Sequence, residues 1–358
     1  MTDYQSLPRG RILVGDALER LQSLPAHSVD MVLTSPPYFR LRDYQVGGQL
    51  GLEQRVDEWV YGLLAVSREL HRVLVPSGTL WLNLGDTYST HLRQGAPRKS
   101  LLLGPERLAL AMVADGWVLR NKIVWAKSNS RPSSVQDRLS SSWEPIYLFA
   151  ASGRPGQRTF FDLDAVRVPH RSRPRQTIVT ATHQQREAWR GPNGDDDHGL
   201  AAMKRAGRVG HALGKNPGDV CQLASSNFRG AHHATFPVLL AEQAILAGCP
   251  EASCSSCRIP WRRAIRKLGQ TAVRGALQPS CRCNADHEPG LVLDPFMGAG
   301  STAVAAERLQ RDWLGIELNP QFVQLADHRI ADQRGKRAAR TPPGAVNKDE
   351  AKSRPSAA

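Results

Sequence analysis

One short segment of the 358-residue chain carries groups that could bind an amine. The segment is Ser35-Pro36-Pro37-Tyr38, and it follows directly on a largely apolar run that begins at Val29. Proline lacks a backbone N–H and has a fixed φ angle, so the two prolines present a carbonyl oxygen on a stiff turn without a competing donor. The serine hydroxyl adds a second acceptor, and the tyrosine ring can stack on a planar heterocycle.

A second segment could bind a nucleoside. Asp294-Pro-Phe-Met-Gly298-Ala-Gly300 lies between a predicted strand and a predicted helix, and its glycines allow a tight turn and close approach to a ligand. The next predicted strand ends at Glu317, whose carboxylate can accept hydrogen bonds from both hydroxyls of a ribose. A tight turn without a ligand and a helix N-terminal charge are the simpler interpretations of these features.

The two segments together resemble those of the DNA amino-methyltransferases. D-P-F-x-G-x-G-[ST] followed by G-I-E is similar to their S-adenosylmethionine site, and T-S-P-P-Y is similar to their catalytic motif. The catalytic motif comes first in this chain, which resembles the circularly permuted β group of the family. The resemblance covers residues 10–150 and 232–330, and it implies two sets of site residues. The catalytic set is Ser35, Pro36, Pro37 and Tyr38; the cofactor-binding set is Asp16, Asp294, Phe296, Gly298, Gly300, Ser301, Thr302 and Glu317.

Methylation of a nucleobase amine explains why the first segment has this composition. The amine lone pair is conjugated with the ring, so oxygen acceptors must hold the amine hydrogens and align the nitrogen for in-line transfer. The Ser35 hydroxyl and the Pro36 carbonyl are the candidate acceptors, and Tyr38 can stack on a base that has been flipped out of the duplex. A cis-proline strand cap beside a core tyrosine is the alternative structural interpretation.

The residue before Pro-Pro bears on the target base. Serine at this position resembles the cytosine-N4 enzymes, whereas aspartate resembles most adenine-N6 enzymes, so Ser35 favours cytosine N4 and leaves adenine N6 as the alternative. Methylation of cytosine C5 needs a cysteine nucleophile, usually within a Pro-Cys pair. The sequence contains no Pro-Cys, which argues against that reaction.

Asp16 ends the first predicted strand. In the permuted group the matching Gly-Asp contacts the adenine of the cofactor, while an N-cap for the helix that follows is the purely structural interpretation. Asp86 ends another predicted strand close to the site, and no role is assigned to it.

The elements that position these residues form an alternating series. Residues 12–149 alternate short apolar runs with helical patterns, as expected for a wound α/β sheet. The resemblance implies a Rossmann-like methyltransferase fold with a seven-stranded, mostly parallel, circularly permuted sheet that carries a basic insertion and a small zinc-binding insertion. The predicted divisions are a catalytic half (10–150), a target-recognition region (151–230), a cofactor-binding half (231–333) with a zinc-finger-like insertion (250–288), and a disordered basic tail (334–358).

Four of the six cysteines have zinc-ligand spacing. Cys254-x2-Cys257 is followed after 23 residues by Cys281-x-Cys283, and two such thiolate pairs can close a tetrahedral zinc site. The segment between the pairs is rich in arginine, so the insertion could contact a DNA backbone, or zinc could simply stabilise a short loop. Unpaired reduced cysteines are the other interpretation. Cys221 and Cys249 are placed outside the cluster, and the candidate substitute ligands are His232, His233 and His287.

Composition sets the broad class of the protein. The formal net charge of +14 suggests a polyanionic partner, because lysine and arginine that neutralise phosphates release counterions. No apolar run reaches about 18 residues, so no membrane span is expected. The first residues lack a basic region followed by an apolar one, so we expect no signal peptide and a cytoplasmic protein, where clustered cysteines indicate metal rather than disulfides.

These observations favour one function over its alternatives. We expect an S-adenosylmethionine-dependent, site-specific methyltransferase that modifies cytosine N4 in double-stranded DNA after base flipping, with a cognate restriction endonuclease as a candidate partner. The alternatives are an adenine-N6 enzyme and a non-catalytic, zinc-containing DNA-binding protein that retains an inactive core. Protein-glutamine methyltransferases use Asn-Pro-Pro-Tyr but carry the cofactor motif first, and a nicotinamide-dependent oxidoreductase would not explain Ser-Pro-Pro-Tyr. Oligomeric state is left open.

Overall fold

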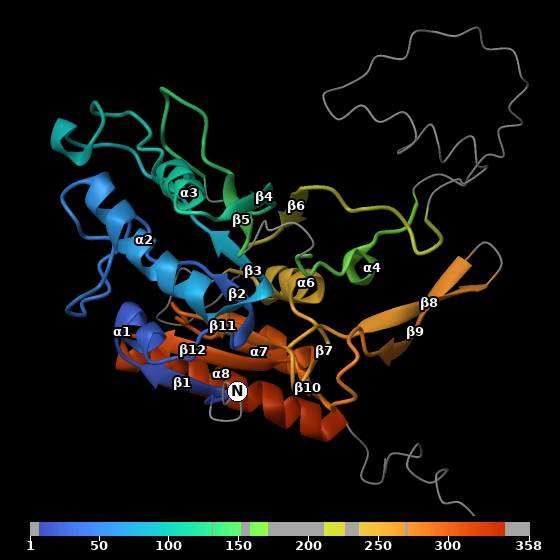
Figure 1. The fold of residues 1–358 in the computed structure, drawn as a ribbon. Helices are drawn as coiled ribbons and strands as arrows, with labels where there is room; N and C mark the ends of the chain where they lie inside the picture. Colours follow the sequence, from blue (N-terminus) through green and yellow to red (C-terminus); the bar gives the residue numbers. More distant parts are fainter. Residues whose placement is uncertain are drawn as a thin grey trace, which may run out of the picture.

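A single eight-stranded sheet forms the centre of the computed structural model (Figure 1). The structure describes residues 7–130, 132–151, 158–170, 211–225, 236–268 and 271–340. The strand order is β1-β12-β11-β2-β3-β5-β4-β6. In chain order the strands are β1 (Arg11–Val14), β2 (Val29–Thr34), β3 (Leu74–Asn83), β4 (Val118–Lys127), β5 (Trp143–Ala150), β6 (Val220–Leu223), β11 (Leu291–Asp294) and β12 (Asp312–Glu317).

The sheet is mostly parallel, as predicted, but it has eight strands rather than seven. Every pairing from β1 to β3 is parallel, β5 runs antiparallel to both of its neighbours, and β6 pairs in parallel with β4. The additional strand, β6, lies in the region 151–230, where the sequence shows no strand pattern. It forms because the open edge of β4 offers unpaired backbone N–H and C=O groups.

Helices cover both faces of the sheet (Figure 1). Along β2 the side chains alternate, with Val32 in the core under one set of helices and Met31 and Leu33 in the core under the other. The sheet is therefore buried on both faces, which explains the nearly unbroken apolar runs of its central strands. The first set is α1 (Ala17–Gln22), α2 (Val56–Val73) and α3 (Gly104–Ala114); the second is α6 (Val238–Gly248), α7 (Ser301–Arg308) and α8 (Pro320–Arg340).

The last helix corrects one predicted boundary. α8 continues past residue 333, so the beginning of the segment 334–358 is helical rather than part of a disordered tail. The guanidinium of Arg334 lies 2.6 Å from the carboxylate of Glu307 on α7, which fixes this last part of the helix. The remainder of the predicted tail lies outside the described residues. Within the described ranges, no helix combines the length and the apolar character needed to cross a bilayer.

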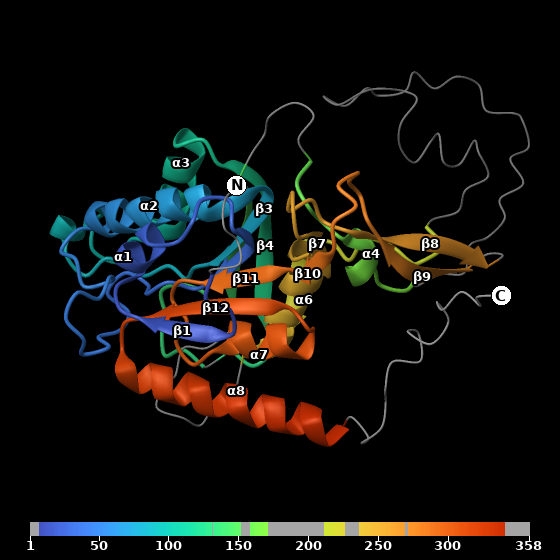
Figure 2. The same cartoon turned by 60° about the horizontal axis from the view of Figure 1, so that its bottom comes forward.

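A small lobe occupies most of the predicted insertion 250–288. Its strands β7 (Ala252–Cys254) and β10 (His287–Pro289) pair with each other, and β8 (Arg262–Leu268) and β9 (Thr271–Gln278) form a hairpin that projects away from the sheet (Figure 2). β10 leads directly into β11. The lobe is therefore attached at the amino ends of the parallel strands.

A buried ion pair fixes the lobe to the sheet. The guanidinium of Arg258, 4% exposed, contacts the carboxylate of Asp30 in β2, which is 1% exposed. The same carboxylate accepts hydrogen bonds from the Leu291 backbone N–H at 2.9 Å and from the Ser253 hydroxyl at 3.0 Å. The pair thus links the lobe to two central strands and satisfies the buried carboxylate.

A second buried carboxylate joins the two sequence motifs. Asp294, at the end of β11, accepts hydrogen bonds from the hydroxyls of Thr34 at 2.8 Å and Thr302 at 2.6 Å, and from the Phe296 N–H at 3.1 Å. Thr34 ends β2 and Thr302 lies in the first turn of α7. The ends of β2 and β11 are therefore held together although they lie 260 residues apart in the chain. Burial raises the pKa of Asp294 to about 6.

Loss of the lobe's buried arginine should destabilise the whole fold. Arg258→Ala leaves the Asp30 carboxylate buried without its countercharge, and we expect the free energy of unfolding to fall by about 3–5 kcal/mol in urea titrations. Arg68→Ala is the matched control, because the Arg68 side chain is 60% exposed in its ion pair with Asp115. The control should leave the unfolding midpoint almost unchanged. Equal effects of the two substitutions would contradict the role assigned to the buried pair.

The raised pKa of Asp294 predicts a pH-dependent stability. Between the ordinary pKa of 3.8 and the folded value of about 6, the folded state binds more protons than the unfolded state. The contribution of Asp294 to the free energy of unfolding therefore falls as the pH rises through this range. Asp294→Asn cannot titrate. The stability of the variant relative to the natural protein should therefore rise by on the order of 3 kcal/mol from pH 4 to pH 7 in urea titrations. A difference that stays constant with pH would disprove the assignment.

Candidate functional site

A cavity of about 490 Å³ opens at the carboxyl ends of the central strands, and both sequence motifs line it. This edge of an open α/β sheet is where such folds bind ligands. Nine of the twelve predicted site residues border the cavity: Asp16, Ser35, Pro36, Pro37, Tyr38, Phe296, Gly298, Ser301 and Glu317.

The glycine turn and Glu317 form one end of the cavity. Oε2 of Glu317 accepts the Gly298 N–H at 2.7 Å, and Oε1 accepts the Asn319 N–H at 2.8 Å. Gly298 and Gly300 have φ angles of +50° and +77°, which favour glycine. Each oxygen of Glu317 keeps a further lone pair, so the carboxylate can still accept ligand hydroxyls. Burial raises the pKa of Glu317.

Three predicted cofactor residues do not border the cavity. Asp294 and Thr302 are buried and hydrogen-bonded to each other, and Gly300 has a left-handed backbone conformation at the start of α7. These three residues hold the glycine turn in place from the protein interior. Asp16 does border the cavity and also caps α1, since its carboxylate accepts the Glu19 N–H at 3.1 Å.

The Ser-Pro-Pro-Tyr segment forms the other end of the cavity. The Trp59 indole N–H donates to the Pro37 carbonyl at 2.9 Å, and Phe39 packs edge-on against the same indole. The Tyr38 ring lies close to the backbone of Gly85, where an added Cβ would come within 2.5 Å of the ring. Glycine at this position therefore allows the ring to stand in the cavity.

Three lining residues that carry no sequence motif complete this end. Glu144 is the second residue of β5, Lys127 ends β4 and Asn83 ends β3. The Lys127 ammonium pairs with Oε1 of Glu144, and the Asn83 amide donates to Oε2 at 3.2 Å. Because β5 runs antiparallel to β3, its amino end reaches the edge where the other strands end. Only a weak sequence signal was available: Lys127 ends one predicted strand and Glu144 directly precedes another.

Aromatic residues that sequence reasoning missed lie near Glu317. Tyr44 and Phe322 both border the cavity and meet edge to face, with ring centroids 5.9 Å apart. The Asn319 amide donates to the Tyr44 carbonyl at 3.4 Å, which ties the loop after β2 to the loop after β12. These rings give this end of the cavity an apolar wall suited to a planar ring system.

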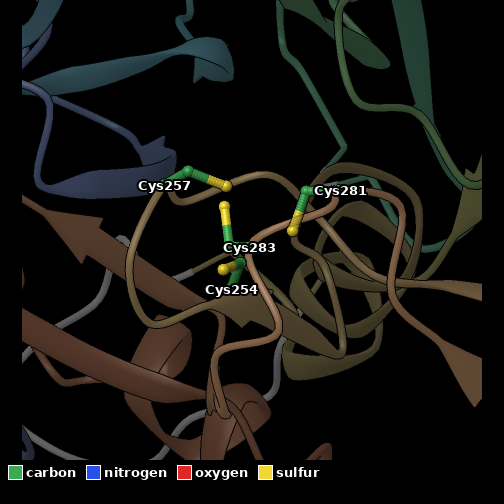
Figure 3. A group of neighbouring side chains, drawn as sticks. All are labelled: Cys254, Cys257, Cys281 and Cys283. Atoms are coloured by element: carbon green, nitrogen blue, oxygen red, sulfur yellow. The ribbon is translucent and has the colours of Figure 1, made fainter.

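The four predicted metal ligands form one cluster (Figure 3). The sulfurs of Cys254, Cys257, Cys281 and Cys283 all lie within 4.8 Å of one another. Tetrahedral zinc with Zn–S bonds of about 2.3 Å requires sulfurs about 3.8 Å apart, so the cluster fits such an ion.

The other candidate ligands stand apart from this group. Cys221 lies in β6 and Cys249 at the end of α6, and both are outside the cluster. His287 packs on Trp261 with ring centroids 4.3 Å apart. His232 and His233 lie outside the described residues.

Several known proteins that are similar in sequence to this chain are Type II methyltransferases, which agrees with the two motifs that line the cavity. The chain is 30% identical over 345 residues to the Type II methyltransferase M.SmaI of Serratia marcescens, covering 90% of this chain and 91% of that protein. It is 32% identical over 341 residues to M.XycI of Xanthomonas campestris pv. cyanopsidis, covering 89% and 87%. M.SfiI of Streptomyces fimbriatus is 45% identical over 174 residues, covering 46% of this chain and 40% of that one.

Solved structures share the fold. The PvuII DNA methyltransferase (cytosine-N4-specific) superposes with a TM-score of 0.55 at 20% identity, covering 92% of both chains. A putative DNA modification methylase from Thermus thermophilus gives 0.50 at 23% identity, covering 90% and 94%. The family model N6_N4_Mtase, described as DNA methylase, matches residues 29–328. With the two motifs lining one cavity and this match spanning most of the chain, the protein belongs to the N6/N4 DNA methylase family.

Proposed function

We propose that this protein is a site-specific DNA methyltransferase that transfers a methyl group from S-adenosylmethionine to N4 of cytosine after base flipping. One observation carries the proposal: Tyr38 and Ser35 border the same cavity as Gly298 and Glu317. A polar acceptor site for an amine and a turn suited to a nucleoside thus line one cavity. Relatives named Type II methyltransferases over nearly the full chain support the same activity.

The cavity has groups for both ligands. Glu317, Asp16 and the Gly298 turn would hold the cofactor's nucleoside, and the bound cofactor supplies an activated methyl group. At the other end, the Ser35 hydroxyl and the Pro36 carbonyl can accept the hydrogens of the target amine, which orients the nitrogen lone pair toward the methyl group. Tyr38 offers its ring as a stacking surface for the flipped base.

Cytosine N4 is preferred over adenine N6 as the target. The serine before Pro-Pro favours cytosine, and the PvuII DNA methyltransferase, which shares the fold, is cytosine-N4-specific. Adenine N6 stays the alternative because the two bases present similar amine edges. An inactive DNA-binding core is disfavoured, since the catalytic segment and most of the predicted cofactor residues line the cavity intact.

The chain order of the two motifs supports a circularly permuted arrangement. The catalytic segment follows β2 and the glycine turn follows β11, yet these strands are neighbours in the sheet. Residues 10–150 would form the catalytic half and 231–333 the cofactor-binding half. We assign target recognition to 151–230, because Ser225, just after β6, borders the cavity. Much of that region, including 171–210, lies outside the described residues.

We also propose that the cysteine cluster binds zinc in a structural role. The lobe attaches at the amino ends of β2 and β11, whereas the cavity lies at their carboxyl ends. This placement argues against the idea that the basic hairpin contacts DNA bound at the cavity. Zinc would instead fix a lobe that is too small to have its own core.

The proposed partner is double-stranded DNA. The proposed location of the protein is the cytoplasm. The net charge of +14 favours a polyanion. The Type II names of the relatives make a cognate restriction endonuclease a proposed second partner.

Substitution of the catalytic segment should remove activity without unfolding the protein. We expect Ser35→Ala and Tyr38→Ala to lower kcat at least about 100-fold, because each removes a group that acts on the target amine or its base. Tyr61→Ala, at a 70% exposed position on α2, is the control and should keep full activity. Circular dichroism checks the fold.

The product identifies the base. Labelled S-adenosylmethionine, genomic DNA and nucleoside analysis should give N4-methylcytosine. N6-methyladenine would overturn the choice of base, and no methylated nucleoside would overturn the proposed function. Full activity in either alanine variant would refute the assigned roles.

The purified protein should contain one zinc per chain by elemental analysis. Cys257→Ser should lose the metal and lower the melting temperature, because binding free energy becomes folding free energy. Cys221→Ser should keep the metal, since that thiol lies outside the cluster. Protein that is empty after purification without chelator would disprove the site.

A further inference from the structure

We propose that Glu144 is a positioning residue for methyl transfer: its carboxylate orders the hydrogen bonds from Ser35 through Tyr38, so that the Ser35 oxygen faces the target amine as an acceptor. The inference rests on the proposed function and adds a group that no motif marks. Glu144 does not itself need to touch the base; it acts through the two hydroxyls.

The three side chains form a continuous chain of hydrogen bonds in the cavity. The Ser35 hydroxyl donates to the Tyr38 oxygen at 3.3 Å, and the Tyr38 hydroxyl donates to Oε2 of Glu144 at 2.8 Å. Tyr38 also lies 3.2 Å from the side-chain oxygen of Asn83, but the shorter contact goes to the charged acceptor. Charge-assisted hydrogen bonds of this kind are stronger than neutral ones.

The chemistry of the three groups fixes the direction in which the hydrogen bonds run, from Ser35 through Tyr38 to Glu144. A carboxylate only accepts, and a serine or neutral tyrosine hydroxyl has a single proton. Because Tyr38 uses its only proton to donate a hydrogen bond to Glu144, its oxygen can only accept from Ser35, and the Ser35 hydroxyl points toward it. Burial and the neighbouring Glu144 charge raise the pKa of Tyr38 well above its usual value, so the phenol keeps its proton.

This ordering decides what Ser35 offers to the substrate. With its proton committed to Tyr38, the Ser35 oxygen presents lone pairs to the cavity and can hold an amine hydrogen. Without the carboxylate, the serine proton is free to rotate toward the amine, where it opposes the amine hydrogens. The effect therefore concerns the alignment of the amine and not the capture of DNA.

Other residues keep Glu144 in place. Lys127 pairs with Oε1 and leaves Oε2 for Tyr38, and the side chains of this pair are only 22% and 16% exposed. The Asn83 amide donates to Oε2 and to the Pro145 carbonyl, both at 3.2 Å. The carboxylate is thus held from two sides, as expected of a group that must present one oxygen in a fixed direction.

The chain contains a matched control outside the cavity. Glu106 also pairs with a lysine, Lys122 at 2.6 Å, and accepts from a tyrosine hydroxyl, Tyr147 at 3.1 Å. None of these three residues borders the cavity. Glu106→Gln and Tyr147→Phe therefore remove the same kinds of interaction without touching the proposed chain.

Steady-state kinetics with S-adenosylmethionine and DNA test the proposal. Glu144→Gln and Tyr38→Phe should each lower kcat about 10- to 100-fold, as expected for one charge-assisted hydrogen bond, with KM for both substrates within about threefold. The double variant should lose no more than either single variant, because both break one chain. Both controls should keep kcat within twofold. The proposal is overturned if Glu144→Gln keeps kcat, if it raises KM alone, or if the two losses multiply.

A spectroscopic readout separates this inference from the proposed function. If the natural protein methylates no DNA, the function is wrong, and the chain of hydrogen bonds is then tested alone. With 13C-labelled tyrosine, the hydroxyl-bearing carbon of Tyr38, assigned by its absence in Tyr38→Phe, should shift in Glu144→Gln and stay in place in Glu106→Gln. An unchanged Tyr38 signal in Glu144→Gln would overturn the ordering of the chain.

Discussion

The structure depends on the hydrogen bonds that Asp294 makes beneath the cavity. Its carboxylate accepts from Thr34, which ends the strand before the Ser-Pro-Pro-Tyr segment, and from Thr302 in the first turn of the helix after the glycine turn. A buried carboxylate needs such partners, because an unsatisfied charge in the interior is costly. The same requirement therefore holds two segments that are remote in the chain next to each other, and the cavity forms between them.

The parts of the site that could be predicted are those whose chemistry lies in adjacent residues. Ser35 and Tyr38 lie in one turn, and a glycine turn followed by Glu317 needs only the strand–turn–helix pattern. Glu144 and Lys127 carry no such pattern. Their meeting depends on the antiparallel register of β4 and β5, in which Trp125 lies opposite Glu144. Register is set by tertiary packing and turn geometry, so a single sequence does not reveal it.

The sequence also could not show which way a carboxylate at a strand end points. Asp294 and Glu317 both end strands and were both predicted to bind the cofactor, but Asp294 faces β2 and α7 while Glu317 faces the cavity. The cysteine spacing predicted a compact cluster, and the four sulfurs do lie together. That the lobe would attach at the edge opposite the cavity depended on the path of β10 into β11, which composition does not encode.

The strand order has a consequence for biosynthesis. β1 pairs with β12, and one edge of β2 pairs with β11, so these two edges find partners only in the last part of the chain, although the other edge of β2 pairs with β3. A polypeptide still emerging from the ribosome exposes these edges until translation is almost complete, and long-range parallel pairing is slow. Truncated translation products would therefore lack both a finished sheet and the cavity that forms between its two central motifs.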